Sequence, residues 1–565
     1  MQKHSPASET SRPWTITTSR TVLTMVVALW LTVFANFTFW RTVWDGVGGW
    51  SNGSPLFLLS LPLLVWLWLF GLLSLLAWSR ATKLILGILL LVSASANYFI
   101  SSYGILIDSG MLTNVMQTDN KEALELLSWR MAGWLGVFGV LPALLLSRVR
   151  LVTGSWKREL AYKLGGVACA LAGIGAIAFS LYQPYSSLLR NHREVRLMLT
   201  PSNVVGAIHG YARQELKTPV KLQVVGADAH RVVPAGGNAK HKVTVLLVGE
   251  TARSANFSLN GYGRTTNPQL ATQDVISFTD VTSCGTATAV SVPCMFLDVG
   301  HDGYKDTYAK SREGLLDVLQ RAGVAVLWRD NNSGCKGACD RVPNEDLAHL
   351  QIPDVCRPDE CYDEVLLSGL QDYLDKLDRD AVVVLHMKGS HGPSYYKRYP
   401  QAFAKFAPVC SDNQLDRCAP ESIVNAYDNT LLYTDHVLNQ TIELLKRNAA
   451  RLDTAMLYVS DHGESLGENG IFLHGLPYGM APREQTHVPM VLWLSEGLQQ
   501  REHLPASCLA QQRDSALSHD NLFHSLIGLM DVRTSAYRPE LDLFRQCRPQ
   551  ASVVADTKPP RNDVQ

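Results

Sequence analysis

The sequence predicts a multi-pass α-helical membrane domain of five spans, followed by an α/β domain whose mostly parallel sheet is sandwiched by helices. Residues 1–185 contain long apolar blocks without charge, whereas residues 240–545 alternate short apolar runs with helical patterns. Strands that are apolar on both faces and alternate with helices are typical of a parallel sheet. The formal net charge of +0 gives no electrostatic reason to expect nucleic acid as a partner.

Five apolar blocks in the first third of the chain reach or approach the length of a membrane span. None contains Asp, Glu, Lys or Arg, and a helix needs about 20 apolar residues to cross a bilayer. The first block is not a cleavable signal peptide, because four more follow it. The blocks are Thr21–Trp40, Pro55–Trp78, Leu84–Ile107, Met131–Ser147 and Leu164–Gln183.

The short loops between these blocks predict the orientation in the membrane. Basic residues gather before the first block and after the second and fourth, and such loops stay in the cytoplasm. Five spans with the N-terminus inside place everything after the fifth span outside. The basic residues are Lys3, Arg12, Arg20, Arg80, Lys83, Arg148, Arg150, Lys157 and Arg158.

Cysteine usage agrees with an exterior second half. Of the 11 cysteines, Cys169 lies in the fifth block, where we expect an inert buried thiol, and the other ten lie beyond it. An even number outside the membrane predicts disulfides in an oxidising compartment, with nearest-neighbour pairing as the simplest expectation. A structural zinc site is the weaker alternative, because paired CxxC knuckles are absent.

Composition divides the chain into five segments. Asp119 and Glu122 fit the capping box of a short interfacial helix between the third and fourth blocks. Residues 184–215 carry arginines among Leu and Val, which predicts an amphipathic helix on the membrane surface. The segments are a cytoplasmic N-terminus (1–20), a five-helix transmembrane domain (21–183), an interfacial helix and linker (184–241), an exterior α/β domain (242–548) and a disordered tail (549–565).

Four predicted strands of the α/β domain each end in polar residues. Because the carboxyl ends of parallel strands share one edge of a sheet, these polar groups should converge. Coincidental helix capping by Asp and Asn is the alternative. The strands are Val243–Val248, followed by Glu250; Val324–Trp328, followed by Arg329 to Asn332; Ala381–His386, followed by His391; and Met456–Val459, followed by Asp461, His462 and Glu464.

Three of these residues have the chemistry of metal ligands. Glu250, Asp461 and His462 supply oxygen and nitrogen atoms suited to Zn²⁺ or Mn²⁺, and three ligands leave a fourth position open. The stretch 281–294 can fill that position, because it is rich in hydroxyls and precedes a predicted helix whose N-terminus favours a tetrahedral anion. On spacing alone Ser283, Thr286, Thr288 and Ser291 are all possible nucleophiles, and a helix cap locked by a Cys284–Cys294 bridge is the alternative.

Three further residues flank this candidate site in the sequence. His391 lies among Gly and Pro after a strand, and His474 follows His462 by 12 residues. A lone histidine is more often structural, but both stand next to candidate ligands, so we expect them at the site. Lys336, held between Cys335 and Cys339, could pair with a phosphate oxygen; a solvated loop lysine is the equal alternative.

At these residues the chain resembles the lipid A phosphoethanolamine transferases of Gram-negative bacteria, over nearly its full length. The resemblance rests on the five spans and on long motifs. These are VGETARSANFSLNGYGRTTNP, SCGTATAVSVPCMF, LWRDNNSGCKGACD, GSHGPSYYKRYP, NAYDNTLLYTD and SDHGESLGENGIFLHGLPY.

The resemblance implies an alkaline-phosphatase-like hydrolase domain with assigned residues. Thr288 would be the nucleophile, and Glu250, Thr288, Asp461 and His462 would bind one catalytic Zn²⁺ tightly. His391 and His474 would bind the phosphoryl group or a second Zn²⁺. The headgroup site would be lined by Asn332, Ser333, Lys336 and Glu464. The ten exterior cysteines match a five-disulfide pattern, with bonds Cys284–Cys294, Cys335–Cys339, Cys356–Cys361, Cys410–Cys418 and Cys508–Cys547.

The implied reaction moves phosphoethanolamine from phosphatidylethanolamine to a lipid A phosphate through Thr288 and releases diacylglycerol. The resemblance implies a monomer in the bacterial inner membrane, with its catalytic domain in the periplasm, and a lowered lipid A charge that would weaken polymyxin binding. The alternatives are transfer to another acceptor such as a lipopolysaccharide core sugar or Kdo, a phosphoglycerol transferase, a phosphodiesterase, a sulfatase, and a non-catalytic, membrane-tethered metal-binding module.

Overall fold

The computed structural model describes most of the 565-residue chain. The predicted disordered tail, most of the cytoplasmic N-terminus and Asp119 of the predicted capping box lie outside the described residues. The described ranges are 16–49, 54–76, 81–118, 120–152, 154–215, 221–232, 240–358 and 360–548.

The chain forms two compact units. The first comprises Met1–Leu112 and Leu127–Glu215, and the second comprises Thr113–Leu126 and Leu216–Gln565. The second unit therefore includes a short segment from between two apolar helices of the first. This segment was expected to be interfacial, and it contains α7 (Asn120–Glu125).

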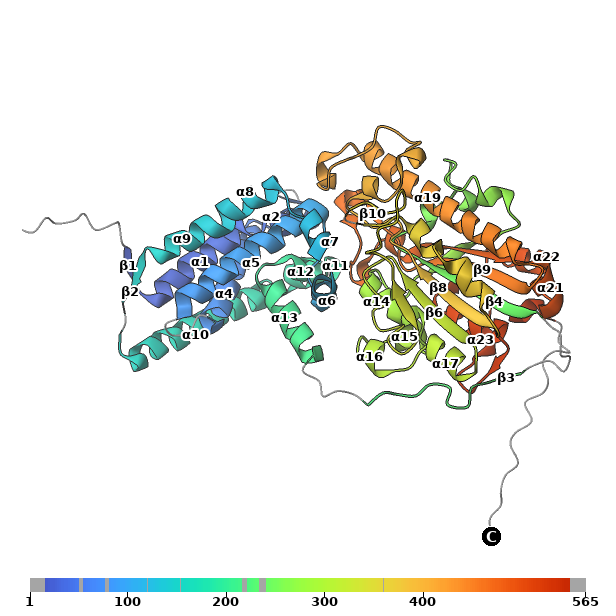
Figure 1. Ribbon diagram of the computed structural model, residues 1–565. Helices are drawn as coiled ribbons and strands as arrows, with labels where there is room; N and C mark the ends of the chain where they lie inside the picture. Colours follow the sequence, from blue (N-terminus) through green and yellow to red (C-terminus); the bar gives the residue numbers. More distant parts are fainter. Residues whose placement is uncertain are drawn as a thin grey trace, which may run out of the picture. The chain divides into compact units, whose positions relative to one another are not determined.

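The first unit is a bundle of apolar helices (Figure 1). Within the described residues, four helical stretches are long and apolar enough to cross a membrane, or five if one bent pair counts as a span. The four are α4 (Pro55–Leu76), α5 (Thr82–Tyr103), the continuous stretch Trp129–Ser147 that ends in α9 (Leu141–Ser147), and α10 (Trp156–Ser180).

The first predicted span is broken into two helices. α1 (Arg20–Phe34) and α2 (Phe37–Val47) meet at an angle of 62°. Asn36 stands at the break, and its side-chain Nδ2 donates to the carbonyls of Leu31 (2.9 Å) and Thr200 (3.1 Å). The backbone N–H of Thr200 in turn donates to Oδ1 of Asn36 at 2.8 Å, so the Asn36 side chain holds the break against a later segment of the helical unit.

The prediction of a buried Cys169 is wrong. The thiol is free and exposed. α10 packs on one side of the bundle and buries only Ala170 among its residues. A position in an apolar helix therefore does not guarantee cover by protein, because a membrane helix can present apolar residues to lipid.

After α10, the predicted amphipathic surface helix is divided into three. These are α11 (Tyr182–Asn191), α12 (Val195–Met198) and α13 (Ser202–Glu215), and they belong to the helical unit. In the second unit, the described residues 221–232 include the short strand β3 (His230–Arg231).

The second unit is built on an eight-stranded sheet of order β13-β5-β12-β9-β4-β8-β6-β7. β4 pairs in parallel with β8 and β9, and β6 pairs in parallel with β7 and β8, whereas β12 runs antiparallel to β5 and β9. The strands are β4 (His241–Gly249), β5 (Ile276–Thr282), β6 (Ala325–Asp330), β7 (Asn344–Asp346), β8 (Ala381–His386), β9 (Leu452–Ser460), β12 (His487–Leu494) and β13 (Leu517–Ser518).

Helices cover both faces of this sheet, which confirms the predicted architecture (Figure 1). Leu246 and Val248 of β4 face a core that includes α17 (Leu315–Arg321) and α23 (Asp520–Leu529). The alternate residues of β4 face a second core, which is closed by α19 (Pro420–Arg447). Because both faces are buried, the central strands read as continuous apolar runs in the sequence.

Candidate metal centre and nucleophile

The register of the central strands brings their polar ends together. Gly249 of β4 pairs with Ser460 of β9, so Glu250 and Asp461 leave the sheet side by side. On the other side of β4, Val248 pairs with His386, which in turn pairs with Asp330 of β6. The predicted convergence of acidic and histidine side chains at one sheet edge is thus present.

Glu250, Asp461 and His462 form a fully buried cluster. Their ligand atoms lie within 4.8 Å of one another, and each residue is 0% exposed. Nε2 of His462 lies 3.3 Å from Oε1 of Glu250 and 3.5 Å from Oδ2 of Asp461. Nδ1 of His462 donates to the carbonyl of Gly463 at 2.9 Å, which directs Nε2 at the two carboxylates.

A divalent metal ion fits this cluster. Oε1 of Glu250 and Oδ2 of Asp461 are buried and have no hydrogen-bond partner among the described residues. Two buried carboxylate oxygens without partners are costly, and a cation held between them would satisfy both. Carboxylate oxygen and imidazole nitrogen are donors that Zn²⁺ accepts.

The electrostatics of the cluster show the same demand for positive charge. Burial and the neighbouring charge of Glu250 raise the pKa of Asp461 to about 7. Burial opposes the charged form of His462, yet Asp461 and Glu250 raise the pKa of His462 to about 10. Burial also works against the Glu250 carboxylate, but His462 holds the pKa of Glu250 well below its usual value. A bound cation would take over the role that the His462 proton plays here.

Among the four candidate hydroxyls, only that of Thr288 contacts side-chain atoms of this cluster. Its Oγ1 donates to Oε2 of Glu250 at 3.0 Å and lies 3.3 Å from Nε2 of His462. Thr288 is the first residue of α14 (Thr288–Met295), after Ala287 in an extended conformation. The other three hydroxyls donate to backbone carbonyls: Ser283 to Gly285, Thr286 to Leu476 and Ser291 to Asp461.

His391 and His474 lie next to the cluster. The ring centroids of His462 and His474 are 4.3 Å apart, and those of His391 and His474 are 5.6 Å apart. Nδ1 of His474 donates to Oε2 of Glu464 at 2.8 Å, and the other oxygen of Glu464 accepts from Tyr395 at 2.5 Å. Glu464 therefore orients His474 and leaves its Nε2 available for a ligand.

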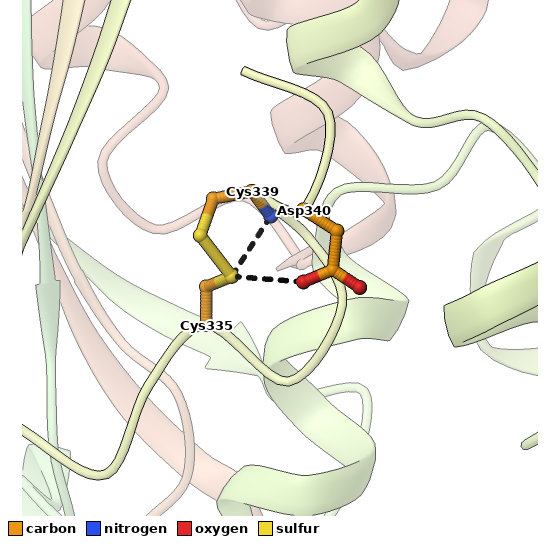
Figure 2. A group of neighbouring side chains, drawn as sticks. All are labelled: Cys335, Cys339 and Asp340. Carbon is orange, nitrogen blue, oxygen red and sulfur yellow. Dashed lines mark hydrogen bonds between the residues drawn. A yellow bond between two sulfur atoms is a disulfide. The ribbon is translucent and has the colours of Figure 1, made fainter. Parts of the chain in front are cut away.

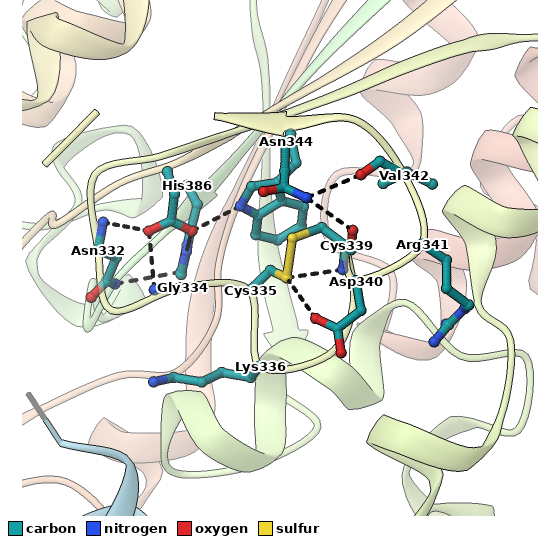
Figure 3. The surroundings of a disulfide bond; sticks show 12 residues. Asn332, Gly334, Cys335, Lys336, Cys339, Asp340, Arg341, Val342, Asn344 and His386 are labelled. Atoms are coloured by element: carbon teal, nitrogen blue, oxygen red, sulfur yellow. Dashed lines mark hydrogen bonds and ion pairs between the residues drawn. A yellow bond between two sulfur atoms is a disulfide. The ribbon is translucent and has the colours of Figure 1, made fainter. Parts of the chain in front are cut away.

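Asn332, Ser333 and Lys336 lie on one loop after β6. Nδ2 of Asn332 donates to Oε2 of Glu250 at 2.7 Å, and Nζ of Lys336 donates to the carbonyl of Ser333 at 2.9 Å. Figure 3 shows Asn332 beside His386 and Lys336 extended away from the disulfide of this loop. Asn332 thus orients a candidate ligand, and Lys336 remains partly exposed near it.

A disulfide between Cys335 and Cys339 closes this loop (Figures 2 and 3). These cysteines and Asp340 lie as close together as metal ligands would, but the bonded sulfurs offer no thiolate. The other bonds join Cys284 to Cys294, Cys356 to Cys361, Cys410 to Cys418 and Cys508 to Cys547.

His519 was not predicted from the sequence. It links the loop before Thr288 to β9, the strand that precedes Asp461 and His462. His519 is 1% exposed; its Nδ1 accepts from the backbone N–H of Cys284 at 3.0 Å, and its Nε2 donates to the carbonyl of Ser460 at 2.9 Å. Burial lowers the pKa of His519 to about 4, so the ring is neutral at pH 7, as this pair of bonds requires. No local pattern marks this residue, because its partners are distant in sequence.

The segment Thr113–Leu126 contributes a second unforeseen residue. The carboxylate of Glu125 accepts from Lys397 at 2.8 Å and from Arg398 at 3.0 Å. Nε of Arg398 donates to the carbonyl of His391 at 2.9 Å. Glu125 thus supports the loop that carries His391.

The fold and this cluster define the class of protein. The second unit combines a mostly parallel sheet, a buried group of candidate metal ligands and a hydroxyl at a helix N-terminus. The sequence model of the Sulfatase family matches residues 242–532, and a second family model, Phosphoethanolamine transferase EptA/EptB, matches residues 65–216.

Individual relatives narrow this class. The chain is 43% identical to phosphoethanolamine transferase EptA of Salmonella typhimurium, over 93% of this chain and 96% of that protein. It is 38% identical to phosphatidylethanolamine transferase Mcr-1 of Escherichia coli, over 93% of this chain and 97% of that protein. The structure of the integral membrane lipooligosaccharide phosphoethanolamine transferase A of Neisseria meningitidis matches with a TM-score of 0.91 and 37% identity, covering 94% of this chain and 99% of that one. The chain belongs to the EptA/Mcr family of phosphoethanolamine transferases and is an integral membrane enzyme.

Proposed function

We propose that this enzyme transfers phosphoethanolamine from phosphatidylethanolamine to a phosphate of lipid A, through a covalent phosphoethanolamine adduct of Thr288. The observation that carries the proposal is the position of Thr288 Oγ1, 3.0 Å from Glu250 Oε2 and 3.3 Å from His462 Nε2. The donor is supported by the name of the Mcr-1 relative, and the acceptor class by that of the Neisseria structure.

Glu250, Thr288, Asp461 and His462 would hold one Zn²⁺ in this proposal, and His391 and His474 would hold the phosphoryl group or a second Zn²⁺. The first assignment is supported by Oε1 of Glu250 and Oδ2 of Asp461, which have no hydrogen-bond partner among the described residues. The Nε2 atom of His474, left available by the bond of Nδ1 to Glu464, supports the second. Bound Zn²⁺ would lower the pKa of the Thr288 hydroxyl and offset negative charge on the phosphoryl oxygens.

The reaction has two displacement steps at one phosphorus. Oγ1 of Thr288 attacks the phosphorus of phosphatidylethanolamine, and the bond from phosphorus to the glycerol oxygen breaks. The Thr288 proton, which points at Oε2 of Glu250, leaves the hydroxyl, and the departing diacylglycerol oxygen gains a proton. An oxygen of a lipid A phosphate then attacks the same phosphorus, and Thr288 departs and recovers its proton.

Four further residues would help to bind the headgroup of the phosphatidylethanolamine donor, two indirectly and two by direct contact. Asn332 and Glu464 are bonded to Glu250 and His474, so they would act by orienting those side chains. Ser333 and Lys336 are partly exposed on the loop after β6, so they would face the phosphate of the donor.

The membrane topology follows from the basic loops. We propose a cytoplasmic N-terminus, a transmembrane domain at 21–183 and a periplasmic catalytic domain at 242–548, acting as a monomer in the inner membrane. Donor and diacylglycerol both reside in the bilayer, which gives the apolar helices a role beyond anchoring. An added ammonium group reduces the negative charge of lipid A, so the outer membrane would bind cationic polymyxins less well.

Mass spectrometry of lipid A from cells that express the full-length enzyme tests this function. We expect lipid A to gain one phosphoethanolamine unit, and we expect the gain to vanish in Thr288→Ala. Thr272→Ala is the matched control, because Thr272 is an exposed hydroxyl outside the site, bonded to the carbonyl of Gln269. If lipid A stays unmodified while a core sugar or Kdo gains phosphoethanolamine, the proposed acceptor is wrong and the proposed donor stands.

A further inference from the structure

The helical unit contains a pocket that takes no part in the proposed chemistry. It has a volume of about 370 Å³ and lies where α1 and α10 begin, beside the small parallel pair of β1 (Ile16–Thr18) and β2 (Val149–Leu151). Its walls come from the first turns of α1, from the end of α4 and from α10. This volume is in the range of pockets that hold small ligands or headgroups.

The lining of this pocket is strongly cationic. Arg20, Arg158 and Lys163 line it, and Glu159 is the one acidic residue among the described residues that line it. Glu159 forms an ion pair with Arg20 and also accepts from the backbone N–H of Gly154 at 3.1 Å. Three cations against one carboxylate leave an excess of positive charge, which favours an anionic ligand.

One donor of this lining is buried and unpaired. Nε of Arg20 is covered from solvent and has no hydrogen-bond partner among the described residues, although another nitrogen of the same guanidinium binds Glu159. Arg158 is exposed; one of its nitrogens donates to the hydroxyl of Tyr162 at 3.3 Å, and its guanidinium lies 5.5 Å from the Tyr162 ring centroid. A guanidinium that stacks on an aromatic ring keeps further N–H donors for an oxyanion.

Aromatic residues indicate that the pocket lies at a membrane surface. Trp156 and Tyr162, both of the lining, are 70% and 58% exposed. They stand at the start of α10, one of the helices long and apolar enough to span a bilayer. Exposed Trp and Tyr at helix ends are typical of the headgroup level of a membrane, where basic pockets between helices bind anionic headgroups.

We propose that this pocket binds the phosphate headgroup of an anionic phospholipid. Arg158 and Lys163 attract the phosphodiester, and the exposed aromatic rings lie along the adjoining acyl chains. The excess positive charge disfavours the ammonium group of phosphatidylethanolamine, so the bound lipid is a different one from the proposed donor. The pocket shares no residue with the metal centre, so this site is a second lipid site of the enzyme.

Native mass spectrometry of the full-length protein in detergent tests the proposal, with phosphatidylglycerol, phosphatidylethanolamine and inorganic phosphate as separate probes. We expect phosphatidylglycerol to bind at least tenfold more tightly than phosphatidylethanolamine. The double variant Arg158→Gln/Lys163→Gln should weaken phosphatidylglycerol binding at least tenfold. Arg158→Lys/Lys163→Arg, which keeps both charges, should retain most of the binding.

The matched control removes the same charge at the same end of the unit. Arg150 and Lys157 are exposed and do not line the pocket, so Arg150→Gln/Lys157→Gln should bind phosphatidylglycerol within twofold of the wild type. Thermal unfolding without added lipid checks that each variant is folded. Equal binding of both lipids, or equal loss in the control, would overturn the proposal. Binding of inorganic phosphate as tight as that of the lipid would also overturn it, because a soluble anion would then be the ligand.

Discussion

Oγ1 of Thr288 donates a hydrogen bond of 3.0 Å to Oε2 of Glu250, across 38 residues of sequence. One residue begins a helix and the other follows a central strand of the sheet. This contact joins the hydroxyl to a cluster that a cation would complete, because Oε1 of Glu250 and Oδ2 of Asp461 have no hydrogen-bond partner among the described residues. The candidate nucleophile and the candidate metal site are therefore one site.

Removal of one carboxylate should reduce metal binding. In Asp461→Asn we expect zinc affinity to fall at least tenfold, because one of the two buried anionic ligands is lost. Zinc content after dialysis against a graded chelator measures this. Asp378→Asn, at a side chain that is 74% exposed, is the control for loss of a carboxylate. Equal zinc retention by Asp461→Asn and the wild type would show that the cluster does not hold the metal.

Stability should fall in acid because of His519. The pKa of His519 is about 4 in the folded chain, where burial excludes the charged ring, and about 6.5 when unfolded. A depressed folded pKa means that the unfolded chain takes up the proton first, so stability is lost as the pH falls from 6.5 towards 4. The loss is on the order of 3 kcal/mol.

Chemical denaturation of the enzyme at several pH values measures the contribution of His519. We expect His519→Gln to be less stable at pH 7, because its amide cannot reproduce both bonds, and to show a shallower decline between pH 6.5 and pH 4. An unchanged slope would mean that His519 is not the group that takes up the proton.

Loss of the Glu125 charge should impair catalysis without altering the metal centre. Glu125 accepts from Lys397 and Arg398, and Arg398 donates to the carbonyl of His391. In Glu125→Gln we expect kcat/KM to fall about tenfold, the scale of one charge-assisted contact, with zinc content unchanged.

The control for Glu125 is Glu421→Gln, at a side chain that is 76% exposed in its ion pair with Arg264. A steady-state transfer assay with a phosphatidylethanolamine donor gives kcat and KM. Unaltered kcat/KM in Glu125→Gln would show that Glu125 does not position His391. Loss of zinc from this variant would show that Glu125 has a wider structural role.

The central strands and the candidate metal ligands Glu250 and Asp461 were predictable, because β4 and β9 are apolar on both faces and each is followed directly by a carboxylate. Glu250 and Asp461 follow from that pattern alone. The sequence pattern does not single out one of the four candidate hydroxyls as the nucleophile. Ser283, Thr286 and Ser291 donate to backbone carbonyls, and these contacts exist only in the folded chain.

Long-range contacts explain what the sequence could not reveal. The break in the first predicted span depends on Asn36, whose side chain bonds the carbonyl of Thr200, 164 residues away. His519 similarly acts through Cys284 and Ser460. Neither residue has a spacing or neighbour that marks it, because the groups that make it important are brought to it by folding.

A covalent adduct on Thr288 would be the most direct evidence for the proposed mechanism. The measurement is the intact mass of the full-length protein after incubation in detergent with zinc and phosphatidylethanolamine but no acceptor, followed by peptide mapping. We expect an added phosphoethanolamine on Thr288 that is absent from Thr288→Ala. An unmodified Thr288 in zinc-loaded protein that still transfers phosphoethanolamine to lipid A would contradict the covalent mechanism.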